Sequence, residues 1–348
     1  MKPVSPDLDR PATEAAPIEP ARSQRSRSRS PGIAHLVEAW ALLGATIGLM
    51  VFFSLLPSTS ETFPTVANLQ ATLGNQSVLA ILALAVLIPL TANSYDLSVG
   101  ATLAVTSIFA ASAMSSGAPI LAALALVIGI GLVIGLANGL LVTRAGVDSF
   151  IVTLGTAIVI EGIVLWKSGG KSIVNDIPQS LTSFGSNSFL EIPLLVYVAV
   201  AAAALVYVVL SHTPYGRRIQ AVGSNLKAAR LVGIGVNRIT LSTFVVGGML
   251  AGVAGLLQVA RSGAGNPQIG PGYTLPAFAA AFLSIAAVKP GRFNPWGLMV
   301  AILFLATLNS GLNLAGVNTY VNDFANGLAL IAGVSIAGVF GRRRSREV

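Results

Sequence analysis

Uncharged apolar runs recur along the chain and are separated by short polar connections. A helix needs about 20 apolar residues to cross the hydrocarbon core of a bilayer, so each run predicts one membrane span. The first run is long for a signal-peptide core and no A-x-A cleavage pattern follows it, which predicts a retained span. The pattern predicts an all-α, polytopic membrane protein of about ten spans. These are residues 39–56, 76–95, 97–116, 119–142, 147–166, 192–211, 239–260, 273–289, 295–315 and 321–340.

Composition excludes the other broad classes. Only 10% of the 348 residues are charged and 54% are hydrophobic, whereas soluble domains carry about 25% charged residues. The runs are continuous and do not alternate, which excludes an outer-membrane β-barrel. The chain has no cysteine, so disulfides, thiolate metal sites and cysteine nucleophiles are excluded.

The basic residues fall mostly in the connections after even-numbered spans, and this sets the predicted orientation. They are Arg144; Arg217, Arg218, Lys227, Arg230 and Arg238; Lys289 and Arg292; and Arg342, Arg343, Arg344 and Arg346. Lys and Arg near span ends are retained in the cytoplasm, so we expect both termini there and no role in nucleic-acid binding. Residues 1–33 are rich in Pro, Ser, Arg and Glu and predict a disordered cytoplasmic tail. Residues 34–341 form the predicted transmembrane domain, and residues 342–348 form a basic cytoplasmic tail.

Glycines recur at helix-packing spacing in two of the predicted spans. Gly131, Gly135 and Gly139 lie four residues apart in the fourth span, and Gly248, Gly252 and Gly255 are similarly placed in the seventh. Small residues let helix backbones approach closely inside a membrane. We therefore expect these two spans to be packed inside the bundle.

Few ionisable side chains lie within the spans, and such side chains are candidates for a functional role. Asp96 lies in the polar break TANSYDLSVG, where it could cap the following helix or belong to a broken helix that lines a pathway. Glu161 could reach the interface or pair with Lys167 or Lys171, and Asp323 begins the tenth span. The candidate pathway residues are Asn93, Ser94, Asp96, Ser98, Asn138, Thr153 and Asn309.

Catalytic and metal-binding motifs are not found. The segment SGGKS resembles a phosphate loop, but Leu165 occupies the position of its first glycine. The only histidines, His35 and His212, lie at span ends and provide no buried base or metal site. We predict no catalytic residue, metal or cofactor, so any ATP that drives this protein must be hydrolysed by another chain.

The connection over residues 212–238 is basic and cytoplasmic by the charge argument. Ser224–Val232 predicts a short amphipathic helix, with Asn225 as its cap and with Gly223 and Gly233 at its ends. Its small apolar face is Ala228, Ala229, Leu231 and Val232. The alternatives are docking to a partner protein and lying on anionic lipid headgroups, and the few charges and small apolar residues favour the partner.

Several motifs, in order, resemble the permease subunits of bacterial ABC importers of the ribose and simple-sugar class, which are related to branched-chain amino-acid permeases. They are DLSVG at Asp96–Gly100, GLANGLLVTRAGVDSFIVTLGTAIVIEGIVLW at Gly135–Trp166, the loop TPYGRRIQAVGSNLKAARLVGIGV, KPGRFNPWG at Lys289–Gly297 and FANGLALIAGV at Phe324–Val334. The resemblance spans about residues 35–340. It departs at Gly272–Gly291, where many relatives carry an acidic residue and a Gly-Gly pair, and at Asn93–Tyr95.

The resemblance implies a permease of the inner membrane that pairs with a second permease chain and receives its solute from an external binding protein. It also implies that Gly223, Asn225, Ala228, Ala229, Leu231 and Gly233 belong to the helix that contacts an ATPase subunit. The expected function is alternating-access import of a monosaccharide or similar small polar solute. One alternative is an ion-coupled secondary transporter, which needs carboxylates near the middle of the membrane, and Asp96 is the only candidate for such a group. The other alternative is a membrane-embedded enzyme.

Overall fold

The computed structural model describes residues 33–345 and consists almost entirely of helices. The long helices are α1 (Ile33–Leu55), α2 (Val66–Thr91), α3 (Val99–Ser115), α4 (Ile120–Arg144), α5 (Ser149–Ser168), α7 (Leu194–His212), α10 (Val236–Ser262), α11 (Ile269–Leu283), α12 (Pro295–Leu314) and α13 (Thr319–Ser345). The short elements are α6 (Gln179–Ser186), β1 (Ser188–Phe189), β2 (Ile192–Pro193), α8 (Pro214–Ser224), α9 (Leu226–Leu231) and the 3₁₀ turn η1 (Ser284–Ala286).

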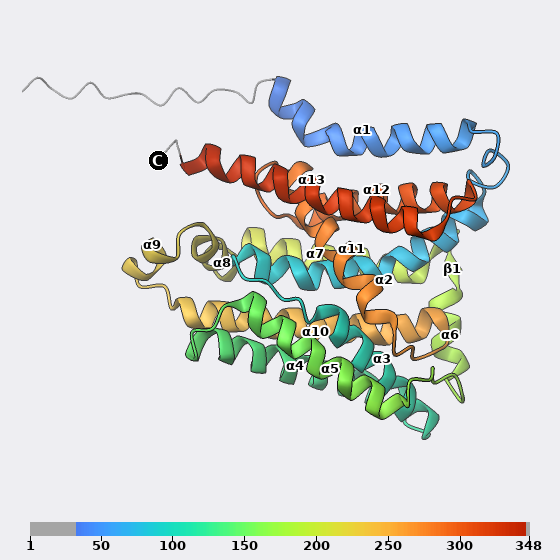
Figure 1. The fold of residues 1–348 in the computed structure, drawn as a ribbon, viewed down its shortest axis with the longest axis horizontal. Helices are drawn as coiled ribbons and strands as arrows, with labels where there is room; N and C mark the ends of the chain where they lie inside the picture. The colour runs from blue at the N-terminus through green and yellow to red at the C-terminus, as the bar shows by residue number, and fades with distance from the viewer. Residues whose placement is uncertain (1–32, 346–348) are drawn as a thin grey trace, which may run out of the picture.

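The ten long helices correspond one to one with the ten predicted spans. Among the described residues, seven are long and apolar enough to cross a membrane by length and composition, while α3 and the apolar part of α1 are shorter. The helices run back and forth, so α8, α9 and the end of α13 lie at one end of the bundle, and β1 and α6 at the other (Figure 1). We call these the α9 end and the β1 end.

Helix α2 forms the centre of the bundle. Every residue from Ser77 to Leu90 is buried, as expected for a helix that is apolar on all sides. Helices α7, α10, α11 and α12 pack around it. Helix α1 lies at the edge of the bundle, where Phe53 packs against Gly311 of α12.

The glycine spacing predicted that the fourth and seventh spans are packed inside the bundle. These spans are α4 and α10, and their glycines meet where the two helices cross, although only 22% of the span in α4 is buried. A Cβ atom on Gly131 or Gly135 would collide with the backbone of α10 at Gly248 or Phe244. A Cβ atom on Gly252 would collide with Val127 of α4. The two backbones are therefore in direct contact, and glycine is what permits it.

Some predicted boundaries were wrong. The second span was predicted at 76–95, but α2 begins at Val66 and ends at Thr91. Its first turns carry polar residues that find hydrogen-bond partners, such as Asn68 with Phe63. The predicted basic tail 342–348 overlaps α13, which continues to Ser345. The predicted N-terminal tail lies outside the described residues except for Ile33, which begins α1.

Candidate functional site: a coupling unit and a broken segment

Helix α2 stops at the polar break because of its local sequence. Asn93 has a left-handed backbone with φ of 57°, which asparagine tolerates better than most residues. The backbone N–H groups of Asn93 and Ser94 donate to the carbonyls of Leu90 and Pro89 at 2.9 and 3.0 Å. This pattern is a Schellman motif. The chain then runs without helix to Ser98, and α3 starts at Val99.

Asp96 organises this extended segment. Its Oδ1 accepts hydrogen bonds from the backbone N–H of Ser98 at 3.0 Å and from the Ser98 hydroxyl at 2.5 Å. Asp96 therefore makes a turn just before α3, but the prediction that it caps this helix was wrong, because Ser98 occupies the N-cap position. Both side chains are buried, Ser98 completely.

Side chains of α4 and α5 bond to the same segment and hold it inside the bundle. Asn138 of α4 donates from Nδ2 to the Ser98 hydroxyl at 2.9 Å and accepts from the Thr156 hydroxyl at 2.7 Å. The Thr153 hydroxyl of α5 accepts from the backbone N–H of Leu97 at 3.0 Å. These contacts satisfy backbone and side-chain groups that would otherwise lose free energy inside the membrane.

The structure thus unites four of the predicted pathway residues, Asp96, Ser98, Asn138 and Thr153, in one buried network. Ser94 is also buried and Asn93 is exposed, both beside the network. Asn309 lies elsewhere, on α12, where its Nδ2 donates to Asn326. Sequence reasoning missed Ser149 and Thr156. Their spacing with Thr153 on one face of the fifth span was the available signal.

Replacing Thr153 by Val should destabilise the protein by about 0.5–1.5 kcal/mol, because the partly buried backbone N–H of Leu97 loses its acceptor. Thermal unfolding of the purified protein in detergent measures the change. Thr243→Val is the matched control, since Thr243 is equally buried and its hydroxyl bonds only within α10. Equal effects of the two substitutions would show that the segment is not held by Thr153.

The connection after α7 folds into two short helices and not the single predicted one. Thr213 caps α8, and the Gly216 N–H donates to its hydroxyl at 3.2 Å. Ile219 and Val222 of α8 are buried. Gln220 donates from Nε2 to the Leu210 carbonyl at 2.8 Å. Helix α8 is therefore fixed on the ends of the long helices.

Gly223 was predicted to punctuate a helix end, and this prediction was wrong. It lies inside α8, where a Cβ atom would collide with the carbonyl oxygen of Thr91. Thr91 is the last residue of α2, two positions before Asn93. Gly223 thus brings α8 directly against the point where the broken segment begins.

Helix α9 is capped as predicted. The Ala228 N–H donates to Oδ1 of Asn225 at 3.0 Å. Gly233 ends the unit with φ of 80°, a backbone that favours glycine. Ala228 is exposed, but Ala229 is only 3% exposed, so the prediction that it shares one exposed face with Leu231 was wrong. The backbone N–H of Ile234 donates to the Ala229 carbonyl at 3.0 Å, which closes the C-terminal turn of α9.

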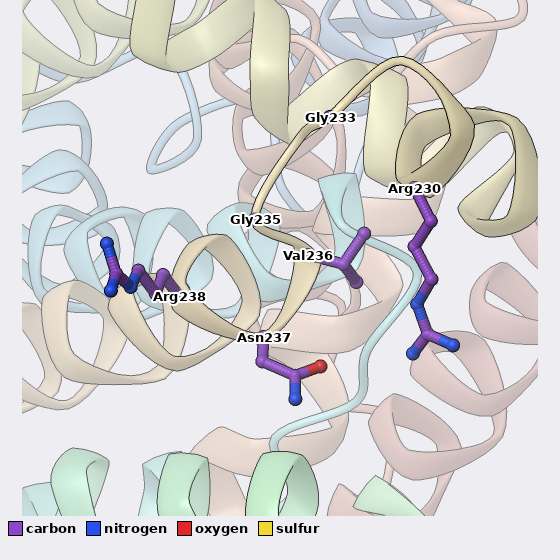
Figure 2. A pocket seen from close by; sticks show the side chains of 6 residues that line it. All are labelled: Arg230, Gly233, Gly235, Val236, Asn237 and Arg238. Carbon is purple, nitrogen blue, oxygen red and sulfur yellow. The ribbon is translucent and has the colours of Figure 1, made fainter.

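The outer surface of this coupling unit, α8 and α9 with the following loop, is apolar at its tip and basic around it. Leu231 is 88% exposed and Val232 is 75% exposed. A pocket of about 650 Å³ is lined by Arg230, Arg238 and the Gly233–Gly235 loop. Figure 2 shows Arg230 reaching from α9 and Arg238 from the first turn of α10. A second pocket of about 400 Å³ adds Arg218.

The comparisons with known proteins place the chain in a family. Residues 68–334 match the family model described as the permease component of the branched-chain amino acid transport system. The chain belongs to this permease family. It is 31% identical to the ribose import permease protein RbsC of Escherichia coli (strain K12) over 309 residues, which are 88% of this chain and 96% of that protein.

Other relatives are similar at the same level. The ribose import permease protein RbsC of Bacillus subtilis (strain 168) is 32% identical, over 84% of this chain and 91% of its own length. The D-allose transport system permease protein AlsC of Escherichia coli (strain K12) is 30% identical, over 85% and 91%. No solved structure matches the chain significantly. The expected resemblance to sugar-importer permeases is confirmed, and the chain is a multi-pass membrane permease.

Proposed function

We propose that this permease is the transmembrane subunit of an ATP-driven importer that carries a monosaccharide or a similar small polar solute. A separate ATPase subunit hydrolyses ATP. The observation that carries the proposal is the coupling unit. Its tip, Leu231 and Val232, is exposed, Arg218 and Arg238 line a pocket together with Val232, and Gly223 of α8 lies directly against the end of α2. The names of the ribose and allose relatives support the solute class.

The coupling unit has the chemistry of a docking site. A fully exposed leucine on a rigid, capped helix suits an apolar slot in a partner protein. Arg218, Arg230 and Arg238 suit acidic side chains at the rim of that slot. The partner is therefore an ATPase subunit with an acidic border around an apolar groove.

The mechanism follows from the contacts behind the tip. Closure of two ATPase subunits displaces α8, and α8 contacts the end of α2 through Gly223 and Thr91. The displacement passes into the Asn93–Ser98 segment and through Asn138 and Thr153 into α4 and α5. A non-helical segment between packed helices is a natural place for such a change of backbone. The bundle then alternates between two accessible states.

The proposed assembly holds a second permease subunit, identical or different, and an external solute-binding protein, in the lipid of the bacterial inner membrane. The arginines at the α9 end support a cytoplasmic location for that end and for both termini. The β1 end, with α6 and the β1–β2 hairpin, then faces the solute-binding protein.

Uptake should survive collapse of the proton and sodium gradients and should stop when ATP is depleted. The reason is that the carboxylate of Asp96, the one candidate for ion coupling, is engaged by Ser98. Radiolabelled D-ribose uptake by vesicles that contain the permease, its ATPase and its binding protein measures both conditions. Uptake that follows the ion gradient and ignores ATP would favour a secondary transporter.

A further inference from the structure

Four asparagines face one another between α12 and α13, and we call them the amide ladder. Asn309 and Asn313 are one turn apart on α12, and Asn322 and Asn326 are one turn apart on α13. Nδ2 of Asn309 donates to Oδ1 of Asn326 at 3.3 Å. Nδ2 of Asn322 donates to Oδ1 of Asn313 at 2.5 Å. Each rung therefore uses only one donor and one acceptor.

The ladder leaves two acceptors unused. Among the side chains that the structure describes, three buried oxygens have no hydrogen-bond partner, and two of them are Oδ1 of Asn309 and Oδ1 of Asn322. The third is Oε1 of Gln76, one turn along α2 from Thr72. A buried acceptor without a donor costs free energy and needs a reason. A ligand that brings hydroxyl groups would supply the missing donors.

The position of the ladder suits the entry of a solute. Helix α12 ends, and α2 and α13 begin, at the β1 end of the bundle, which is external in the proposed orientation. On the adjacent face of α12, Ser310 bonds to Thr72 and Asn68 of α2. Helix α13 packs mainly against α11. The polar rungs thus join two helices that make few other contacts with each other.

We propose that the amide ladder is an outer binding subsite for a neutral, polyhydroxylated solute such as a monosaccharide. The inference rests on the proposed function and adds the place and chemistry of the first contact. Each amide both donates and accepts, as sugar hydroxyls do. The four amides are uncharged, so their donors and acceptors suit a neutral solute.

The other explanation is that the rungs only hold two helices together, since polar side chains bond helices in membranes. The double substitution Asn309→Leu with Asn326→Leu distinguishes a binding role of the ladder from a purely structural one. Replacing both members of a polar pair by apolar ones is nearly neutral for folding. Loss of the hydrogen bonds to a solute should instead lower D-ribose uptake by vesicles that hold the whole importer about tenfold.

The matched control is Thr72→Val with Ser310→Ala, which removes the polar pair between α12 and α2. It should keep uptake at the wild-type level. The amount of permease in the membrane and copurification of the ATPase report folding for both variants. Normal uptake by the leucine variant, or an equal loss in the control, would overturn the proposal.

A second measurement does not depend on which solute is carried, so it separates failure of the ladder from failure of the proposed function. The chain has no cysteine, which makes single-cysteine labelling clean. In the assembled importer, N309C should react with a water-soluble methanethiosulfonate applied from the external side. L305C, one turn away and fully buried, should not. If N309C is as inert as L305C, no aqueous subsite reaches the ladder.

Discussion

Replacing Leu231 by Asp should abolish transport and ATPase association while the permease remains folded. Leu231 is 88% exposed and ends the short helix that projects from the bundle, so its side chain contributes nothing to the fold. Complete burial of an exposed leucine side chain in an interface is worth about 1.5–3 kcal/mol, so its loss should weaken the complex about tenfold to a hundredfold. A charge of the same sign as the acidic rim we infer on the ATPase adds repulsion. Copurification of the ATPase with the tagged permease measures the effect, with D-ribose uptake as the second measurement.

Leu190→Asp is the matched control for this substitution. Leu190 is 77% exposed and lies in the turn between β1 and β2, at the opposite end of the bundle. Its φ of 50° is tolerated by aspartate. The control variant should retain the ATPase. If both variants keep the ATPase, or both lose it, Leu231 is not the docking anchor.

Replacing Gly131 by Ala should cost about 1–3 kcal/mol, the usual effect of overpacking. The added Cβ would meet the carbonyl of Gly248, and both partners are backbone, so α4 and α10 would have to separate. This crossing is a direct backbone contact between α4, whose Asn138 bonds to the broken segment, and α10, which follows the coupling unit. We therefore expect loss of transport together with a lower unfolding temperature in detergent.

Gly129→Ala lies on the same helix and has open space around its position. It should be neutral or slightly stabilising, because alanine favours a helix over glycine by about 1 kcal/mol. An equal loss of stability in both variants would mean that helix flexibility, and not the contact with α10, is what glycine provides in α4.

The spans could be predicted because each membrane helix corresponds to one continuous apolar run of about its own length. Helix α2 shows where this rule stops. Its first turns contain Asn68, Gln70 and Asn75, and all three bond to other parts of the protein, such as Asn75 to Arg261. Because these residues are polar, the apolar pattern does not reveal the first turns of α2. Their hydrogen-bond partners, which are distant in the sequence, explain why these turns are helical. The break after Thr91 could be predicted, since polar residues interrupt the apolar run there.

The candidate site could be predicted only in part. The polarity of Ser98, Asn138 and Thr153 was enough to select them as candidates. It could not show that they bond around one segment, because hydrogen bonds between distant helices leave no local pattern in the sequence. For the coupling unit, the asparagine cap had a local signature. The burial of Ala229 did not, since in a short helix alanine suits either face. Glycine is needed at position 223 because α8 lies against the end of α2 there, and α2 lies more than a hundred residues earlier in the sequence.

The central claim is that the coupling unit is the place where an ATPase drives this bundle. A photoreactive amino acid at position 231, in the assembled importer, tests it most directly, because the side chain there is almost fully exposed. We predict a crosslink to the ATPase subunit and none from position 190 at the other end. A crosslink from position 231 only to lipid or to the solute-binding protein would contradict the account.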